Sequence, residues 1–212
     1  MYNKDSIFSL ANGIKTSNRR VFLIVFFTVV FSGIAQEKSI KKTEKYDVVV
    51  TDSITYHRKY HSNGKISVSI VFSDDKNSKK WKKYNRKGIL TESGKLLNGT
   101  INYIKYHSNG NKTETGTISK DKKIKEIHLF TKEGSLTEIK KITKELIEYS
   151  KYYENGKVKE SGTIIESTGN KEWKKFTKTG LLKETATVSN GVMEYKKYDK
   201  YGRVSETGKI IN

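Results

Sequence analysis

The sequence predicts an all-β protein, an elongated, twisted antiparallel sheet of tandem β-hairpins that follows an N-terminal signal peptide. Three observations predict this fold. Glycines recur at a fixed spacing, aromatic and aliphatic residues hold fixed positions around them, and only 34% of the 212 residues are hydrophobic while 31% are charged. A fixed period indicates a repeat architecture. The low hydrophobic share favours a thin sheet, and the 11% of aromatic residues argues against a disordered chain.

Residues 1–35 have the pattern of a signal peptide. Arg19 and Arg20 precede the apolar run Val21–Ala35, which ends in a small-x-small cleavage motif. This run is shorter than the roughly 20 residues that a membrane span takes. We therefore expect cleavage, no transmembrane span afterwards, and export to the periplasm, surface or medium of a bacterium; the alternative is an uncleaved signal anchor. The chain has no cysteine, which excludes disulfides, a thiolate nucleophile and a lipoprotein anchor.

Seven glycines set the frame of the repeat. Their spacing alternates between 24 and 22 residues, so every second unit recurs after 46 residues. The chain accordingly reads KYHSNGK at 59–65, KYHSNGN at 105–111 and KYYENGK at 151–157. We expect residues 55–212 to form seven repeats, and residues 36–54 to add an edge strand or to stay loose. The turn glycines are Gly64, Gly88, Gly110, Gly134, Gly156, Gly180 and Gly202.

The positions around each turn glycine predict the type of turn. Position −4, four residues before the glycine, is aromatic in all seven units, and position +2 is aliphatic in six. A type I′ turn would need positive φ at the preceding residue, where Lys87, Glu133 and Tyr201 are unfavourable. A type I turn closed by a left-handed glycine avoids this and sets positions −4 and +2 opposite each other. The segment EIKKITKELIEY at 138–149 could pass for a short helix, but its place in the frame favours strands.

Two stretches carry a resemblance to a known family: YSKYYENGKVKESGTI at 149–164 and KEWKKFTKTGLLKETAT at 171–187. Their pattern of two aromatics, Asn-Gly-Lys, an aliphatic residue, Glu and Gly resembles MORN-type repeats, and more narrowly the variant of YwqK-like antitoxin proteins. The resemblance covers residues 55–212. It implies an elongated, twisted sheet of successive hairpins and the neutralisation of a toxin by protein contact. MORN repeats are also linked to scaffolding and to acidic phospholipids.

A candidate binding face combines positions −5 and −7, which strand alternation places on the side opposite position −4. One interpretation is a cationic, aromatic surface for an acidic lipid, glycan or protein, with nucleic acid disfavoured by export. The other is a solvated face whose lysines prevent aggregation. The candidate residues are Lys59, Lys83, Lys105, Lys151, Lys175 and Lys197 at position −5, and Trp81, Tyr103, Tyr149, Trp173 and Tyr195 at position −7.

Position +4 is glutamate in six units, which raises the question of catalysis. Glycoside hydrolysis needs two carboxylates in unlike environments, whereas the same glutamate recurs here. We expect a structural role instead, such as pairing with Lys82, Lys174 or Lys196 across the hairpin. We predict no catalytic residue, no cofactor and no metal site, and we expect His61 and His107 to be surface residues of turns.

The sequence therefore predicts a non-enzymatic, exported repeat protein that acts as a protein-interaction module or scaffold, in the manner of an antitoxin. The alternative is an envelope protein that binds acidic lipid or glycan through its lysine and aromatic face. A protein partner is expected first, and an acidic lipid or glycan second.

Overall fold

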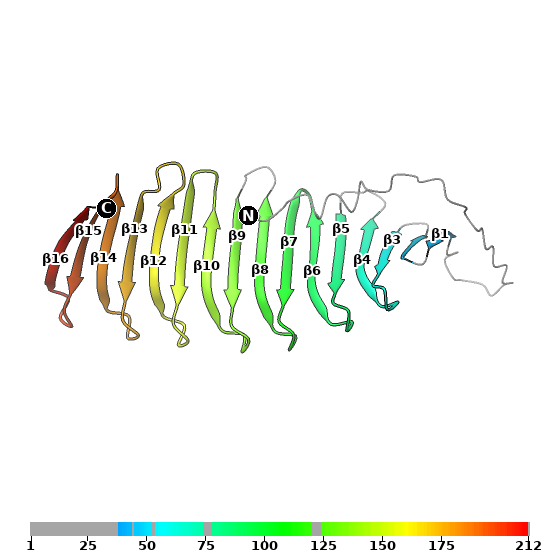
Figure 1. Ribbon diagram of the computed structural model, residues 1–212, viewed down its shortest axis with the longest axis horizontal. Coiled ribbons are helices and arrows are strands. Elements are labelled where there is room, and N and C mark those ends of the chain that lie inside the picture. Colours follow the sequence, from blue (N-terminus) through cyan, green and yellow to red (C-terminus); the bar gives the residue numbers. More distant parts are fainter. Residues whose placement is uncertain (1–37, 44, 52–53, 74–77, 120–123, 212) are drawn as a thin grey trace. The chain divides into compact units, whose positions relative to one another are not determined.

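The computed structural model describes residues 38–43, 45–51, 54–73, 78–119 and 124–211, so the expected signal peptide lies outside the described residues. The described residues form one antiparallel sheet of sixteen strands, in which each strand pairs with its neighbours in the chain. Figure 1 shows the strands side by side in sequence order. The sheet is open, because β1 and β16 are its two edges. The predicted all-β architecture of sequential hairpins is thus confirmed.

The strands are β1 (Lys38–Thr43), β2 (Tyr46–Val50), β3 (Ile54–Tyr60), β4 (Ile66–Ser73), β5 (Ser78–Tyr84), β6 (Leu90–Leu97), β7 (Thr100–Tyr106), β8 (Lys112–Ser119), β9 (Lys125–Phe130), β10 (Leu136–Ile142), β11 (Leu146–Tyr152), β12 (Val158–Ile165), β13 (Lys171–Phe176), β14 (Leu182–Ser189), β15 (Val192–Tyr198) and β16 (Val204–Ile211). Strands β10 and β11 cover most of the segment that could have been a helix, which confirms the strand prediction. Among the described residues, no helix is long and apolar enough to cross a membrane.

The seven turn glycines adopt the predicted left-handed conformation, with φ between +78° and +96°. In the first hairpin, the Gly64 amide donates to the His61 carbonyl at 3.0 Å, which closes a type I turn. Tyr60 lies opposite Ile66, as the predicted pairing of positions −4 and +2 requires. Among the described residues other than glycine, positive φ occurs only at Asn98 and Asn190, so the asparagines that precede turn glycines do not form type I′ turns.

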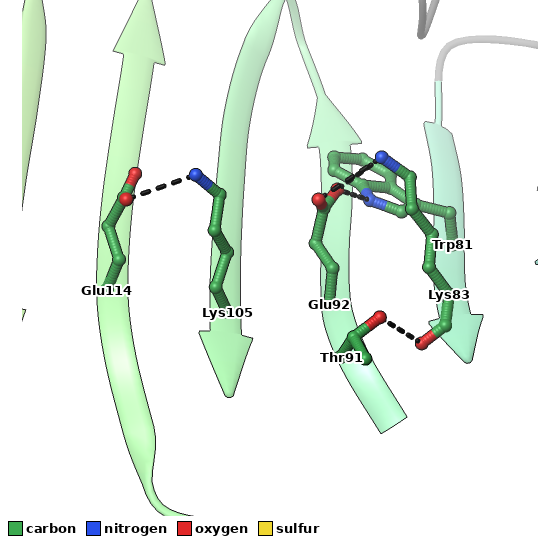
Figure 2. Close-up of polar contacts among 6 residues, drawn as sticks. All are labelled: Trp81, Lys83, Thr91, Glu92, Lys105 and Glu114. Carbon is green, nitrogen blue, oxygen red and sulfur yellow. Dashed lines mark hydrogen bonds and ion pairs between the residues drawn. The ribbon is translucent and has the colours of Figure 1, made fainter. Parts of the chain in front are cut away.

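A second irregularity, at position +3, was not predicted. Lys59 lies opposite Val68, one residue beyond the partner that simple alternation gives, so Ser67 is a bulge. The same shift occurs in the other six hairpins. The Ser67 hydroxyl donates to the Lys59 carbonyl at 3.0 Å, and the same bond recurs at Thr91 in the next hairpin (Figure 2). The bulge sets position +4 opposite −5 and position +6 opposite −7.

The 46-residue period arises partly from loop length at the opposite end of the hairpins. Asn98-Gly99 and Asn190-Gly191 form two-residue turns with positive φ at both residues. In contrast, residues 166–170 form the longer link between β12 and β13. Short links lie in the 22-residue steps and long links in the 24-residue steps, so hairpins alternate between two forms.

The sheet buries few side chains completely. Within the described part of the chain, the only buried hydrophobic residues are Ile70, Trp81 and Ala186, and most strand residues are half-buried. No second layer of the described residues covers either face. Stability must therefore come largely from the backbone ladder and from contacts between neighbouring side chains on each face.

Candidate functional site

The sheet has two chemically different faces. The ring–carboxylate face carries positions −7, −5, +4, +6 and +8, and the hydroxyl face carries positions −8, −6, −4, +2, +5 and +7. The bulge makes this division possible, because positions +2 and +4 would otherwise lie on the same side of the strand. The predicted binding face coincides with the ring–carboxylate face.

A three-residue network forms on the ring–carboxylate face of the second hairpin. Glu92 accepts hydrogen bonds from Trp81 Nε1 at 2.8 Å and from Lys83 Nζ at 3.1 Å (Figure 2). Glu92 and Trp81 are both buried. The carboxylate is thus neutralised by the lysine and oriented by the indole, which satisfies its desolvated oxygens.

The same network recurs in four further hairpins, so it belongs to the repeat. Figure 2 shows its lysine–glutamate pair in the third hairpin as well. We predicted that the glutamates would pair with Lys82, Lys174 or Lys196, and this prediction is wrong: the bulge shifts the register by one residue and sets Ser or Thr opposite these lysines. The recurring networks are Tyr103–Glu114–Lys105, Tyr149–Glu160–Lys151, Trp173–Glu184–Lys175 and Tyr195–Glu206–Lys197.

The bulge also explains the glycines at position +6, which lie opposite the rings of position −7. A Cβ added to Gly94 would lie 2.1 Å from the Trp81 ring, and one added to Gly116 would lie 2.3 Å from the Tyr103 ring. In these two hairpins the ring therefore lies over the glycine of the neighbouring strand, with its polar edge at the glutamate two residues before that glycine. In the sixth hairpin the small residue opposite Trp173 is Ala186.

The lysines of the candidate face also contact the aromatic rings. Lys105 Nζ lies 5.6 Å from the centre of the Tyr103 ring, and Lys151 Nζ lies 5.3 Å from that of Tyr149. The first and fourth hairpins depart from the pattern: Lys59 lies over Tyr46, and Leu129 replaces the lysine. The structure thus brings the predicted lysines and rings together, but with a carboxylate that compensates most of the charge.

The electrostatics of the network agree with this geometry. The hydrogen bond from Lys175 holds the pKa of Glu184 below its usual value, and Trp173 adds to the effect. Burial would raise the pKa of Glu160, but bonds from Lys151 and Tyr149 outweigh it and lower that pKa. Burial and the nearby Glu160 raise the pKa of Tyr149 to about 12. The surroundings therefore favour charged glutamate and neutral tyrosine at neutral pH.

An aliphatic stripe on the ring–carboxylate face escaped the sequence prediction. Position +8 is apolar in every hairpin, and cross-strand partners such as Ile101 and Ile147 widen the row. None of its members is buried by the described residues. The recurrence of apolar residues at position +8 is visible in the sequence. However, positions +2 and +8 are six residues apart, so simple strand alternation, without the bulge, would place position +8 on the hydroxyl face. The stripe consists of Phe72, Leu96, Ile118, Ile142, Ile164, Val188 and Ile210.

The repeated KYHSNGK sequences make contacts between neighbouring turns. His61 Nε2 lies 2.9 Å from the Tyr84 carbonyl, and the Asn63 amide donates to the Arg86 carbonyl at 2.8 Å. Odd-numbered turns thus bond to the even-numbered turn that follows, which gives these sequences a structural reason to recur. The equivalent contacts are His107 to Phe130, Tyr153 to Phe176, Asn109 to Lys132 and Asn155 to Lys178. The described residues contain no cluster of three or more potential metal ligands.

The hydroxyl face carries a pocket of about 750 Å³ over strands β4 to β9. Its floor includes Ser93, Thr115 and Asn102, and its lysines are Lys80, Lys82 and Lys95. All three lysines are exposed, and within the described residues none has an ion-pair or hydrogen-bond partner. Sequence reasoning missed this cluster, because Lys95 joins Lys80 and Lys82 only through the pairing of β5 with β6.

Comparison with known proteins gives no family. No family model matches the chain, and no curated protein matches it. Among solved structures, a candidate 6-phosphogluconolactonase of Bacteroides fragilis is 9% identical, with 82% of this chain and 84% of that chain covered and a TM-score of 0.23. Hsv2 of Kluyveromyces lactis is 9% identical, with coverage of 82% and 74% and a TM-score of 0.20. Likenesses this weak carry no argument about fold or function.

Proposed function

We propose that this protein is a non-catalytic repeat module that binds a partner protein through the aliphatic stripe and the adjoining rings of its ring–carboxylate face. The stripe carries the proposal. It is a row of mostly half-buried apolar side chains on a sheet that no other described layer covers, and Lys79, Lys125 and Lys171 divide it into shorter apolar groups. Apolar surface that stays partly exposed in groups of this kind commonly marks protein contact sites.

The recurring networks support a non-catalytic role. Catalytic carboxylates need environments that separate their pKa values. Here Glu160, Glu184 and Glu206 have the same kinds of neighbours, and the pKa of each is lowered. Five networks of the same composition, spread along the sheet, fit a scaffold better than one reaction centre. Export and an antitoxin-like role, which the sequence pattern and the MORN resemblance suggest, belong to the same proposal.

The test is capture of a partner followed by mapping of the contact. A partner recovered with the full chain is retested against Ile118→Asn/Ile164→Asn, which makes the stripe polar at two places. The control is Thr117→Asn/Thr163→Asn, which changes the adjacent residues on the opposite face. We expect the stripe variant to lose the partner and the control to keep it, with little effect of moderate salt because the contact is apolar.

Either of two results would overturn the stripe as the contact surface. One is a partner that survives the stripe substitutions unchanged, and the other is a partner that both variants lose equally. Circular dichroism and thermal unfolding of both variants show whether the sheet is intact, so misfolding cannot be mistaken for loss of contact.

The alternative of an acidic lipid or glycan bound by the position −5 lysines has less support, because glutamates neutralise most of them. Three lysines without a described partner, Lys80, Lys82 and Lys95, lie on the other face, at the pocket.

A further inference from the structure

We propose that the pocket on the hydroxyl face is a binding site for an acidic oligosaccharide, held by Lys80, Lys82 and Lys95. This inference goes beyond the protein contact proposed above, because it concerns the opposite face and different residues. The two proposals can therefore fail separately.

The first observation is a pair of like charges. Lys80 lies directly opposite Lys95 in the pairing of β5 with β6, and Lys82 lies on the same face two residues along β5. Like charges directly opposite each other destabilise a sheet. Since none of the three has an anionic partner among the described residues, a bound anion would relieve the repulsion.

The second observation is that this pair departs from the repeat. Position −8 is glutamate in the last four hairpins, and in the second hairpin Lys80 reverses the charge. In the seventh hairpin the same two positions carry opposite charges, and Lys209 forms an ion pair with Glu194 at 3.0 Å. Position −8 is thus most often acidic in this repeat, whereas in the second hairpin, at the pocket, it is the basic residue Lys80. The glutamates are Glu126, Glu148, Glu172 and Glu194.

The third observation is the chemistry of the pocket. Small hydroxyl residues such as Ser93 and Thr115 form the floor, and Tyr84 and Ile104 supply apolar surface. Asn102 accepts a hydrogen bond from the Thr117 hydroxyl at 3.0 Å, which leaves its amide hydrogens for a ligand. Hydroxyl and amide groups beside a ring suit the hydroxyls and C–H faces of sugars. The pocket crosses strands β4 to β9, a width of roughly 24 Å at the usual strand spacing, which accommodates several sugar units.

The charge is unevenly distributed along the pocket. Lys80, Lys82 and Lys95 line it at β5 and β6, and Glu126 and His128 line it at β9. Glu126 Oε1 lies 2.7 Å from His128 Nε2, so this carboxylate already has a partner. The acidic groups of a ligand therefore belong over β5 and β6, and its neutral hydroxyls over β7 to β9.

Other acidic ligands fit less well. An acidic peptide that adds to a sheet needs a free strand edge, but β5 to β8 are paired on both sides. A membrane surface would require apolar side chains that protrude into it, and this region of the face is hollow. A saccharide needs neither a free edge nor a protrusion.

The experiment measures binding of oligogalacturonate and of a sulfated oligosaccharide to the full chain by calorimetry at low and moderate salt. The test variant is Lys80→Asn/Lys95→Thr, which introduces the Asn102 and Thr117 pair of the third hairpin. We expect at least one of the two probes to bind, and its affinity to fall about tenfold or more in the variant, because charge-assisted hydrogen bonds are lost. Binding should also weaken as salt rises.

A matched control removes the same charge from the same face. Lys174→Ser/Lys196→Ser changes two exposed lysines that lack a described partner and lie outside the pocket. We expect its affinity to stay within about twofold of the original, because no direct contact is lost. Thermal unfolding should show that the test variant is no less stable than the original chain, since a repulsive pair has been removed.

The proposal is overturned if neither acidic probe binds, or if the test and control variants lose affinity equally. It is equally overturned if neutral oligogalactose, or oligoglutamate of the same charge, binds as tightly as the acidic saccharides. A protein partner that remains bound to the test variant would leave the stripe proposal intact.

Discussion

At the scale of single residues, the glutamate of each network is the centre of the ring–carboxylate face. Glu92 on β6 bonds a ring and a lysine that both lie on β5, and 8% of its surface is exposed. Removing one partner of a buried charge is costly, because the remaining group is left unpaired. These glutamates hold rings and lysines in one arrangement along the sheet.

The networks should make the folded sheet less stable in acid. The folded-state pKa of Glu160 and that of Glu184 are lowered from 4.5, so their contribution is complete above that value and is lost as pH falls through the folded pKa values. We expect the unfolding temperature to be constant near neutrality and to fall below about pH 4.5. The measurement is thermal unfolding between pH 7 and pH 3.

Glu160→Gln/Glu184→Gln serves as the comparison for that titration. It should unfold at a lower temperature at pH 7 and show a shallower decline in acid, because two of the titrating groups are gone. An unfolding temperature that stays level down to pH 3 would contradict the role assigned to the networks.

At the scale of the hairpin, the sequence predicts the turn but not the bulge. The left-handed glycine follows from Lys87 and Tyr201, which disfavour positive φ, and from the pairing of Tyr60 with Ile66. Position +3 gives no such signal. Ser67 and Thr91 bond the opposing carbonyl, but Lys159 occupies the same place, so composition alone does not mark a bulge.

Because the sequence does not predict the bulge, only part of the candidate site could be predicted. Lys83 and Trp81 lie two residues apart on one strand, so alternation alone places them together. The partnership with Glu92, the aliphatic stripe and the pair Lys80–Lys95 all depend on cross-strand register. A register error of one residue moves each group to the wrong face.

The contacts between turns can be tested with a single atom change. Asn155→Asp keeps the oxygen that accepts from the Lys157 amide at 3.1 Å but removes the donor to the Lys178 carbonyl at 2.9 Å. We expect a loss of stability of about 0.5–1.5 kcal/mol, the usual net value of one hydrogen bond. Chemical denaturation gives the value. Asn170→Asp, in the longer link at the other end, is the control, and an equal loss there would contradict the assignment.

At the scale of the whole sheet, each hairpin contacts only the hairpins beside it. Stability in such repeats is approximately a sum of unit and neighbour terms. Because odd turns bond to the even turns that follow, the natural unit is a pair of hairpins, 46 residues long. The seven hairpins are thus three pairs and one further hairpin.

This organisation predicts an unusual result for deletions. Removing residues 107–152 joins Tyr106 to Tyr153 and preserves the alternation of turns, so we expect a folded sheet with a cooperative transition. Removing only residues 107–130 leaves a longer chain but places two even-type turns in succession. Both products lose the contacts of the third turn with the fourth and keep those of the first with the second and of the fifth with the sixth. We therefore expect the longer product to unfold at no higher temperature than the shorter one, although it has one more hairpin, because that hairpin adds no turn contact.

Circular dichroism and scanning calorimetry of both deletions provide the measurement. If the longer product is the more stable one, then sheet length matters more than the pairing of turns, and the hairpin pair is not the unit of this protein.

The open ladder also has a mechanical consequence. The backbone bonds of neighbouring strands run along the row from β1 to β16. A tensile load applied between the two edges would therefore pull along these bonds, and few buried side chains would resist it. Such a load would peel strands away in succession at modest force, and the extended ribbon would reclose hairpin by hairpin when the tension is released.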